Sequence, residues 1–248
     1  MIANIRQISQ QLLNPCFNSP KEVVSWMGAI QGQDYAMAKW AVGIRLKSPT
    51  LRAVEDALAR GEIIRTHVMR PTWHLVAAED IRWMLKLSAQ RIKSANDSFA
   101  KGHGVDISEA LFSRCNRLIE KLLEGNKSLT KQEIEAGLAN EGMTVDNRLM
   151  TRFMARAEVE GIVCSGVDKG KKATYALLEE RVPPVKELTK DEALATLALR
   201  YFRSHSPASL TDFVWWSGLS VTEARTAMGL IDSQLVKERF DSYELFVH

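Results

Sequence analysis

Residues 128–179 read SLTKQEIEAGLANEGMTVDNRLMTRFMARAEVEGIVCSGVDKGKKATYALLE, and the fold prediction rests on this segment. Thr130 stands three residues before Glu133, a spacing typical of the capping box at the start of a helix. Apolar residues then recur at helical spacing through 146–161, which ends in a glycine. The remainder predicts two strands joined by the basic turn DKGKK at 168–172.

The same order of elements appears three times along the chain. ISEALFSRCNRLIEKLL (107–123) predicts the helix that precedes the quoted segment, and residues 189–248 repeat the whole order, ending in the hairpin LVKERF-DS-YELFVH. The first copy is a variant, with helices predicted at 20–30, 35–46 and 50–60, a hairpin at 62–77 and a long helix from 78. Three helices followed by a hairpin is the winged-helix arrangement.

We therefore expect a mainly α-helical protein with small β-hairpins, built from three tandem winged-helix units. The predicted units are residues 1–104, 105–183 and 184–248. The linkers between them are predicted at FAKGHGVD (99–106) and EERVPPVKEL (179–188), the second of which contains two consecutive prolines that stiffen it.

Composition excludes several classes of protein. No apolar run approaches the roughly 20 residues that span a bilayer, and the N-terminus lacks a signal-peptide pattern. The three cysteines, Cys16, Cys115 and Cys164, form no close pair of the kind found in metal sites. We expect a cytoplasmic protein without a metal or another cofactor.

Basic residues are spread unevenly. Residues 1–104 hold 14 Lys and Arg against 8 Asp and Glu, residues 105–183 hold 12 against 13, and residues 184–248 hold 7 against 9. A basic first third fits a face that binds a polyanion, although an ordinary solvated lysine-rich surface fits equally well.

The middle unit offers the best candidates for DNA contacts. Arg148, Arg152 and Arg156 recur every four residues, which places them on one face of the predicted recognition helix. The alternative is a solvated face partly paired with Glu160. The turn after this helix carries three lysines, which are candidates for phosphate contacts: Lys169, Lys171 and Lys172.

Three segments carry a resemblance to a known family: SWMGAIQGQDYAMAKWAVGIR (25–45), IIRTHVMRPTWHLVAAEDIRWML (63–85) and RYFRSHSPASLTDFVWWSGL (200–219). They resemble the AlkZ/YcaQ-like winged-helix DNA glycosylases. That group carries a Gln-x-Gln or Gln-x-Asp motif, matched here by Gln31-Gly32-Gln33. It also carries an Arg-Thr…Arg-x-Thr-x-His hairpin, matched by Arg65, Thr66, Arg70, Thr72 and His74.

The resemblance implies a C-shaped tandem of winged helices that grips double-stranded DNA. It also implies a monofunctional DNA glycosylase that hydrolyses the N-glycosidic bond of bulky or crosslinked N7-alkylated purines. Gln31 and Gln33 would then be catalytic. Without the resemblance, the alternative is that both side chains only satisfy backbone groups at this junction. Arg65 and Arg70 would hold phosphates, and His74 would orient one of them or a neighbouring backbone group. The alternative for His74 is a structural residue whose hydrogen bonds are satisfied within the hairpin.

A pair of glutamines suits this chemistry because an N7-alkylated purine is already positively charged and leaves without a proton from the enzyme. An amide oxygen stabilises the oxocarbenium-like sugar, and an amide NH₂ group holds the water or the backbone. In an extended segment, residues i and i+2 share a face, so Gln31 and Gln33 would converge. Asp34 is either the water-activating base or the N-cap of the next helix, and we prefer the cap.

Two other classes of function remain open from the sequence. One is a non-catalytic DNA-binding protein such as a transcription regulator, and the other is a scaffold for protein interactions. No heptad seam for dimerisation is apparent, so we expect a monomer. Members of the resembling family continue into a β-rich domain, whereas this sequence stops at ELFVH (244–248). We expect either a piece of a longer protein or a short member with a reduced grip on DNA.

Overall fold

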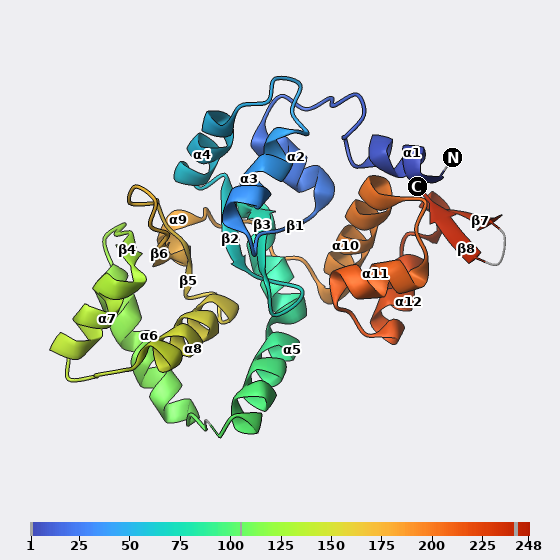
Figure 1. The fold of residues 1–248 in the computed structure, drawn as a ribbon. Helices are drawn as coiled ribbons and strands as arrows, with labels where there is room; N and C mark the ends of the chain where they lie inside the picture. The colour runs from blue at the N-terminus through green and yellow to red at the C-terminus, as the bar shows by residue number, and fades with distance from the viewer. Residues whose placement is uncertain (1, 105, 241–242) are drawn as a thin grey trace.

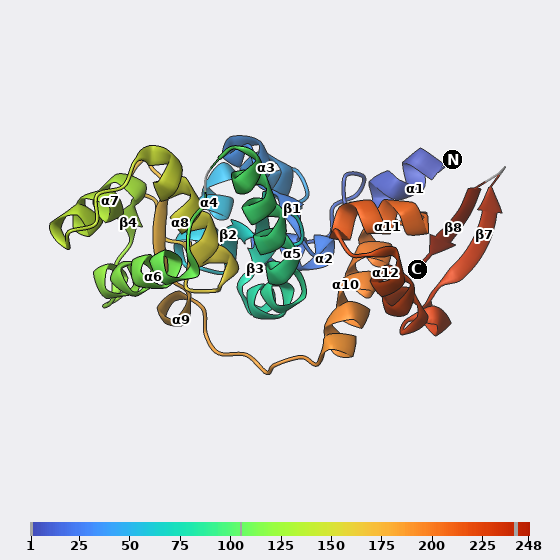
Figure 2. The ribbon, with the colours of Figure 1, turned by 90° about the horizontal axis from the view of Figure 1, so that it is seen from below.

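The computed structural model describes residues 2–104, 106–240 and 243–248, which form helices and three small antiparallel sheets (Figure 1). The predicted turn at 241–242 lies outside the described residues. In Figure 2, α2–α5 lie in the middle, with α6–α9 on one side and α10–α12, together with α1, on the other. The mainly helical fold class with small β-hairpins is confirmed.

The first segment contains the elements α1 (Ile2–Ser9), α2 (Pro20–Met27), β1 (Ile30–Gln31), α3 (Tyr35–Gly43), α4 (Leu51–Ala59), β2 (Ile63–His67), β3 (Trp73–Ala77), η1 (Ala78–Asp80) and α5 (Ile81–Gly102). Its sheet has the order β1-β3-β2. α2 starts where the sequence dictates, since Ser19 and Glu22 form a capping box and Pro20 occupies the first turn. α5 continues to Gly102, so the linker predicted at 99–106 is wrong in its first half.

The middle segment contains α6 (Glu109–Leu123), β4 (Leu129–Thr130), α7 (Lys131–Asn140), α8 (Asn147–Val159), β5 (Val163–Ser165), β6 (Thr174–Leu177) and α9 (Leu178–Arg181). The capping box of Thr130 and Glu133 is confirmed, because each side chain bonds the other residue's backbone N–H. The sheet order β4-β6-β5 places the basic turn at the end of a hairpin.

The last segment contains α10 (Lys190–His205), α11 (Leu210–Ser217), α12 (Val221–Gly229), η2 (Asp232–Gln234), β7 (Val236–Phe240) and β8 (Tyr243–Val247). All three of its helices begin with a capping box at a Ser or Thr. The connection from α9 to α10 is extended and runs along one side of the molecule (Figure 2).

The core of the protein consists of three hydrophobic clusters, the largest of which extends over more than one segment. One lies among α2, α3, α4 and the inner face of the first sheet, and another fills the middle segment. The largest joins the opposite face of the first sheet to the last segment, with Ile64 and Val76 in the same cluster as Tyr201 and Phe213. Burial of these apolar side chains fixes the last segment against the first.

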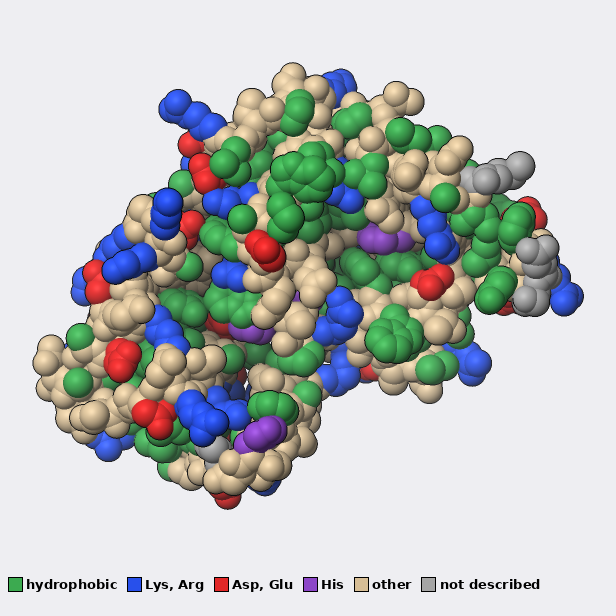
Figure 3. Space-filling model, in the orientation of Figure 1, with side chains coloured by type: hydrophobic (Ala, Val, Ile, Leu, Met, Phe, Trp, Pro, Cys, Tyr) green, Lys and Arg blue, Asp and Glu red, His purple; other side chains and the backbone are tan. Residues whose placement is uncertain are grey.

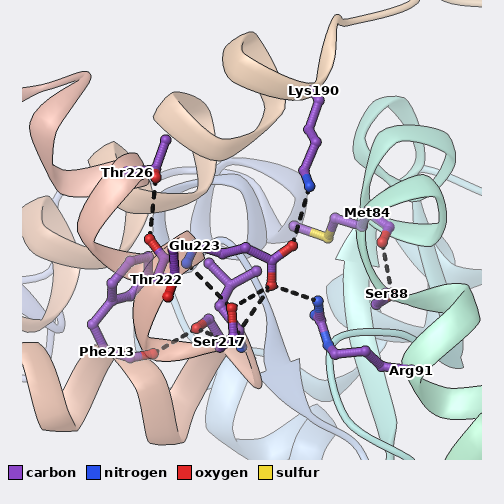
Figure 4. A network of polar contacts seen from close by, with 11 residues as sticks. Met84, Ser88, Arg91, Lys190, Phe213, Ser217, Thr222, Glu223 and Thr226 are labelled. Carbon is purple, nitrogen blue, oxygen red and sulfur yellow. Dashed lines mark hydrogen bonds and ion pairs between the residues drawn. The ribbon is translucent and has the colours of Figure 1, made fainter.

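Ion pairs supplement this apolar contact. Glu223 on α12 lies 3.4 Å from Arg91 on α5 and 3.3 Å from Lys190 on α10, and Ser220 completes its capping interactions (Figure 4). Arg91 and Glu223 are 132 residues apart in the sequence, so this pair joins the last segment to the first. Asp80 also pairs with Arg200 at a buried position between the two segments. The last segment is therefore attached through both a shared core and buried polar groups.

Candidate functional site

The Gln-Gly-Gln motif forms a short extended segment between α2 and α3. Gln31 is paired with His74 of β3, and the N–H of Gly32 donates to the carbonyl of Trp73 at 2.6 Å. Gln33 follows, and its Oε1 accepts from the backbone N–H of Trp73 at 3.3 Å. Because the segment is extended, both glutamines line one cavity of about 360 Å³. The structure thus brings the two predicted catalytic residues together.

Asp34 closes this segment as the N-cap of α3. Its Oδ1 accepts the backbone N–H of Met37 at 3.0 Å, and its backbone is extended as N-caps require. The predicted N-cap is confirmed, because one carboxylate oxygen accepts a backbone N–H of the first turn of α3.

Arg65 points into the motif. Its Nε donates to the carbonyl of Gly32 at 3.0 Å, and its Nη2 lies 3.5 Å from the carbonyl of Gln33. The guanidinium stacks on the Trp73 ring at 3.6 Å and lies 4.8 Å from the centre of the Tyr35 ring. These contacts engage the guanidinium within the protein, and they indicate that Arg65 supports the motif backbone.

His74 is an internal residue that contacts the neighbouring backbone, which is one of the two roles predicted for it, whereas its burial contradicts a direct contact with DNA. Its side chain lies in the first sheet, and the residue is only 2% exposed. Nδ1 lies 3.0 Å from the carbonyl of Thr72. Burial lowers the pKa of His74 to about 4, so the ring is neutral at pH 7. With its ring inside the sheet, His74 orients the backbone of the hairpin through its contact with Thr72.

Arg70 occupies the turn between β2 and β3 and is half-buried. This turn packs closely on the end of α11, where a side chain on Gly218 would meet the carbonyl of Met69 at 2.6 Å and Cγ of Arg70 at 3.1 Å. Gly218 has a positive φ of 68°, which also favours glycine. Contact with the last segment therefore positions the hairpin that carries Arg70.

A loop of the middle segment reaches the motif as well. Asp168, in the loop between β5 and β6, lies close enough to the side chain of Tyr35, at the start of α3, to affect its pKa. Burial, followed by the charge of Asp168, raises the pKa of Tyr35. Ser165 accepts the backbone N–H of Arg65 at 2.9 Å. No spacing in the sequence predicts that Asp168 approaches Tyr35, because the two residues lie in different predicted units.

The three arginines of α8 have different environments. Arg148 is exposed, Arg152 is half-buried, and the Arg156 side chain is only 4% exposed. Arg156 lies 2.6 Å from Glu160, also bonds Glu109, and packs over the Phe112 ring at 4.6 Å. The prediction of a DNA-facing stripe is therefore wrong for Arg156, because carboxylates surround its guanidinium. The alternative of pairing with Glu160 is confirmed.

α5 also covers part of the α8 face. Lys93 pairs with Glu160 at 3.0 Å, and Arg152 lies 3.4 Å from the carbonyl of Asn96. A cavity of about 710 Å³ remains between α5, α6 and α8, with Arg148 and Arg152 among its lining residues. Because neither glutamine lines it, this cavity is separate from that of the motif.

The lysines of the basic turn are not equivalent. Lys169 is bound to Glu133, with Nζ 2.7 and 2.9 Å from the two carboxylate oxygens. Lys171 and Lys172 are exposed. Basic side chains on the face seen in Figure 3 are interspersed with acidic ones rather than gathered in one stripe. Lys171 and Lys172 are therefore more available to an external phosphate than Lys169.

Two further observations concern the described part of the chain. Nowhere in residues 2–104, 106–240 and 243–248 do three His, Cys, Asp or Glu side chains gather as a metal site would require. In the same ranges, no helix is long and apolar enough to cross a membrane.

Comparisons with known proteins agree with this geometry. A family model described as DNA glycosylase AlkZ-like matches residues 24–248. The chain is 23% identical over 252 residues to an interstrand DNA cross-link repair glycosylase of Streptomyces sahachiroi, and the match covers 97% of this chain and 67% of that protein. The solved structure of Streptomyces sahachiroi DNA glycosylase AlkZ matches with a TM-score of 0.77 at 22% identity, over 100% of this chain and 70% of that one.

Proposed function

Because the chain belongs to the AlkZ-like DNA glycosylase family, we propose that it hydrolyses the N-glycosidic bond of bulky or crosslinked N7-alkylated purines in double-stranded DNA. The observation that carries this proposal is the placement of Gln31 and Gln33 in one cavity at the end of the first sheet. The relative from Streptomyces sahachiroi, which is named for interstrand cross-link repair, supports the crosslinked substrate class.

The chemistry requires little acid or base from the protein. The bond between the sugar C1′ and the purine nitrogen breaks, and its electron pair neutralises the positive charge of the alkylated base. The sugar becomes oxocarbenium-like, water adds at C1′, and the proton of that water is lost to solvent. Amide dipoles preorganised by Gln31 and Gln33 would stabilise the cation and hold the water.

The DNA-binding surface is part of the proposal. The segments 1–104, 105–183 and 184–248 act as three winged-helix units, and their helix and hairpin order supports this assignment. The best placed phosphate contacts are Lys171 and Lys172, with Arg70, Arg148 and Arg152 as secondary candidates. A monomer acting in the cytoplasm remains our prediction.

The test is excision from a duplex that contains N7-methylguanine, followed by cleavage at the resulting abasic sites. We expect cleavage of the methylated duplex and none of the unmethylated one. A variant with both Gln31→Ala and Gln33→Ala, purified in the same way, controls for a contaminating glycosylase. If the parent protein binds duplex DNA and releases no base from N7-methylated or N7-crosslinked DNA, the non-catalytic DNA-binding alternative replaces this proposal.

A further inference from the structure

Three polar side chains form a row across the first sheet. Gln31 of β1 is paired with His74 of β3, and His74 is paired with Thr66 of β2. Directly opposed residues in antiparallel strands place their side chains on the same face, with Cβ atoms about 4.5–5.5 Å apart. His74 therefore lies between Gln31 and Thr66, within the reach of both side chains.

The contact between His74 and Thr72 determines which ring nitrogen carries the proton. Nδ1 lies 3.0 Å from the carbonyl oxygen of Thr72, which can only accept a hydrogen bond. Nδ1 must therefore be the protonated nitrogen. In the neutral ring, Nε2 is then an acceptor that carries no hydrogen.

Gln33 shows how the same strand orients the other carboxamide of the motif. The backbone N–H of Trp73 lies 3.3 Å from Oε1 of Gln33, and an N–H can only donate. The oxygen of Gln33 is therefore directed at the strand, and its NH₂ group is the free end of the amide.

We propose that His74 is a positioning residue for Gln31: its bare Nε2 accepts a hydrogen bond from the Gln31 NH₂ group and so turns the carboxamide oxygen toward the cavity. This inference rests on the proposed glycosylase function. The two glutamines then present opposite ends of their amides to the substrate. The oxygen of Gln31 faces the developing positive charge, and the NH₂ group of Gln33 holds the water or a sugar oxygen.

Thr66 is the competing donor for the same nitrogen. It is fully buried, and its Oγ1 has no hydrogen-bond partner among the residues that the structure describes. Buried hydroxyl groups usually have a hydrogen-bond partner. The Thr66 hydroxyl is therefore the alternative donor to Nε2 of His74. A variant that removes only this hydroxyl separates the two possibilities.

Two substitutions at His74 separate support of the fold from orientation of Gln31. In His74→Asn, the amide NH₂ can replace the Nδ1 donor to Thr72, but nothing replaces Nε2. In His74→Gln, the longer side chain can place its amide oxygen near the position of Nε2 while losing the bond to Thr72. A purely structural role predicts that excision follows stability in both variants.

If His74 orients Gln31, the variant that keeps an acceptor near Nε2 should excise faster than the other variant, whichever of the two is the more stable. Under single-turnover conditions with N7-methylguanine duplex, His74→Asn should excise about tenfold more slowly at unchanged DNA affinity, the scale of one lost neutral hydrogen bond. His74→Gln should excise within about threefold of the parent although its urea midpoint is lower. If His74→Gln loses as much excision rate as His74→Asn, or more, the proposal is overturned.

Thr66→Val supplies the matched control. It should leave the excision rate within about twofold of the parent, because Gln31 and not Thr66 is the donor. A loss as large as that of His74→Asn would instead pair Thr66 with His74 and overturn the inference. A parent protein without activity would refute the proposed function. An active parent with an equally active His74→Asn variant would refute this inference alone.

Discussion

The backbone N–H of Trp73 donates a hydrogen bond to the side-chain oxygen of Gln33 at 3.3 Å. Trp73 thereby links the hairpin to the motif twice, since its carbonyl oxygen also accepts the N–H of Gly32 at 2.6 Å. Its ring lies against the guanidinium of Arg65 at 3.6 Å, and Arg65 in turn bonds the carbonyl of Gly32. The segment that carries both glutamines is thus held by its neighbouring strand through backbone and side-chain contacts.

Replacing either motif glutamine should affect excision and not binding. We expect Gln31→Ala and Gln33→Ala each to slow excision of N7-methylguanine by roughly 10²-fold, the usual cost of losing one preorganised dipole. DNA affinity should stay within about twofold, because phosphates dominate binding. Gln132→Ala, on the exposed face of α7, is the control. Equal rates for all three variants would make the motif glutamines structural.

Neutralising Arg65 distinguishes support of the motif from a phosphate contact. Arg65→Gln loses the bonds to Gly32 and Gln33, so excision should fall roughly tenfold or more as the motif shifts. The salt dependence of duplex binding should not change. Arg52→Gln, at an exposed position on α4, serves as the control for lost charge. If the slope of log affinity against log salt concentration falls by about one unit in Arg65→Gln and not in Arg52→Gln, Arg65 contacts a phosphate.

The lysines of the basic turn should contribute unequally to DNA binding. Lys171→Ala and Lys172→Ala should each reduce the slope of log affinity against log salt by about 0.9 units. Lys169→Ala should reduce it less, because Glu133 already binds Lys169. Filter binding at several salt concentrations measures the slopes, with Lys186→Ala in the linker as control. Three equal reductions would mean that Lys169 leaves Glu133 when DNA binds.

Arg156 should matter for stability. Arg156→Ala leaves Glu109 and Glu160 without their shared partner and empties a buried position over Phe112, which should cost roughly 3 kcal/mol of unfolding free energy. Arg148→Ala, two turns earlier on the same helix and exposed, should change it by less than about 0.5 kcal/mol. Urea denaturation compares the two variants. Similar unfolding free energies would contradict the buried network.

Acid should destabilise the protein before its carboxylates titrate. Burial lowers the pKa of both His74 and His205 to about 4, whereas an unfolded histidine titrates near 6.5. The unfolded state therefore binds more protons between pH 6.5 and 4, and stability present above pH 6.5 is lost as the pH falls through this window. From pH 7 to 5.5 we expect a loss of roughly 1 kcal/mol for each histidine.

His205→Asn tests this expectation without touching the motif. Its ring is stacked on Tyr201 with ring centres 4.8 Å apart, in the core of the last segment. The variant should be less stable at pH 7 but should lose less stability between pH 7 and 5.5 than the parent. Urea unfolding at the two pH values measures both quantities. An equally steep pH dependence would show that His205 does not contribute to it.

Local signals in the sequence were sufficient for the elements and for the motif. The capping box at Thr130, the N-cap at Asp34 and the extended Gln-Gly-Gln segment depend on residues that lie within a few positions of one another. Such contacts form wherever the chain adopts that local conformation, so residue spacing predicts them. The convergence of Gln31 and Gln33 follows from the same local geometry.

The environments of Arg156, Arg65 and His74 depend on packing between residues far apart in the sequence. Residue spacing contains no information about such packing. Arg156 is buried because Glu109, 47 residues away, and α5 close over it. Arg65 is directed at the motif because its guanidinium packs on the Trp73 ring of β3 and bonds the carbonyl of Gly32. His74 is neutral because it is buried in the first sheet. Periodicity identifies which residues share a face, whereas the partner that covers that face is set by burial of apolar surface across the whole chain.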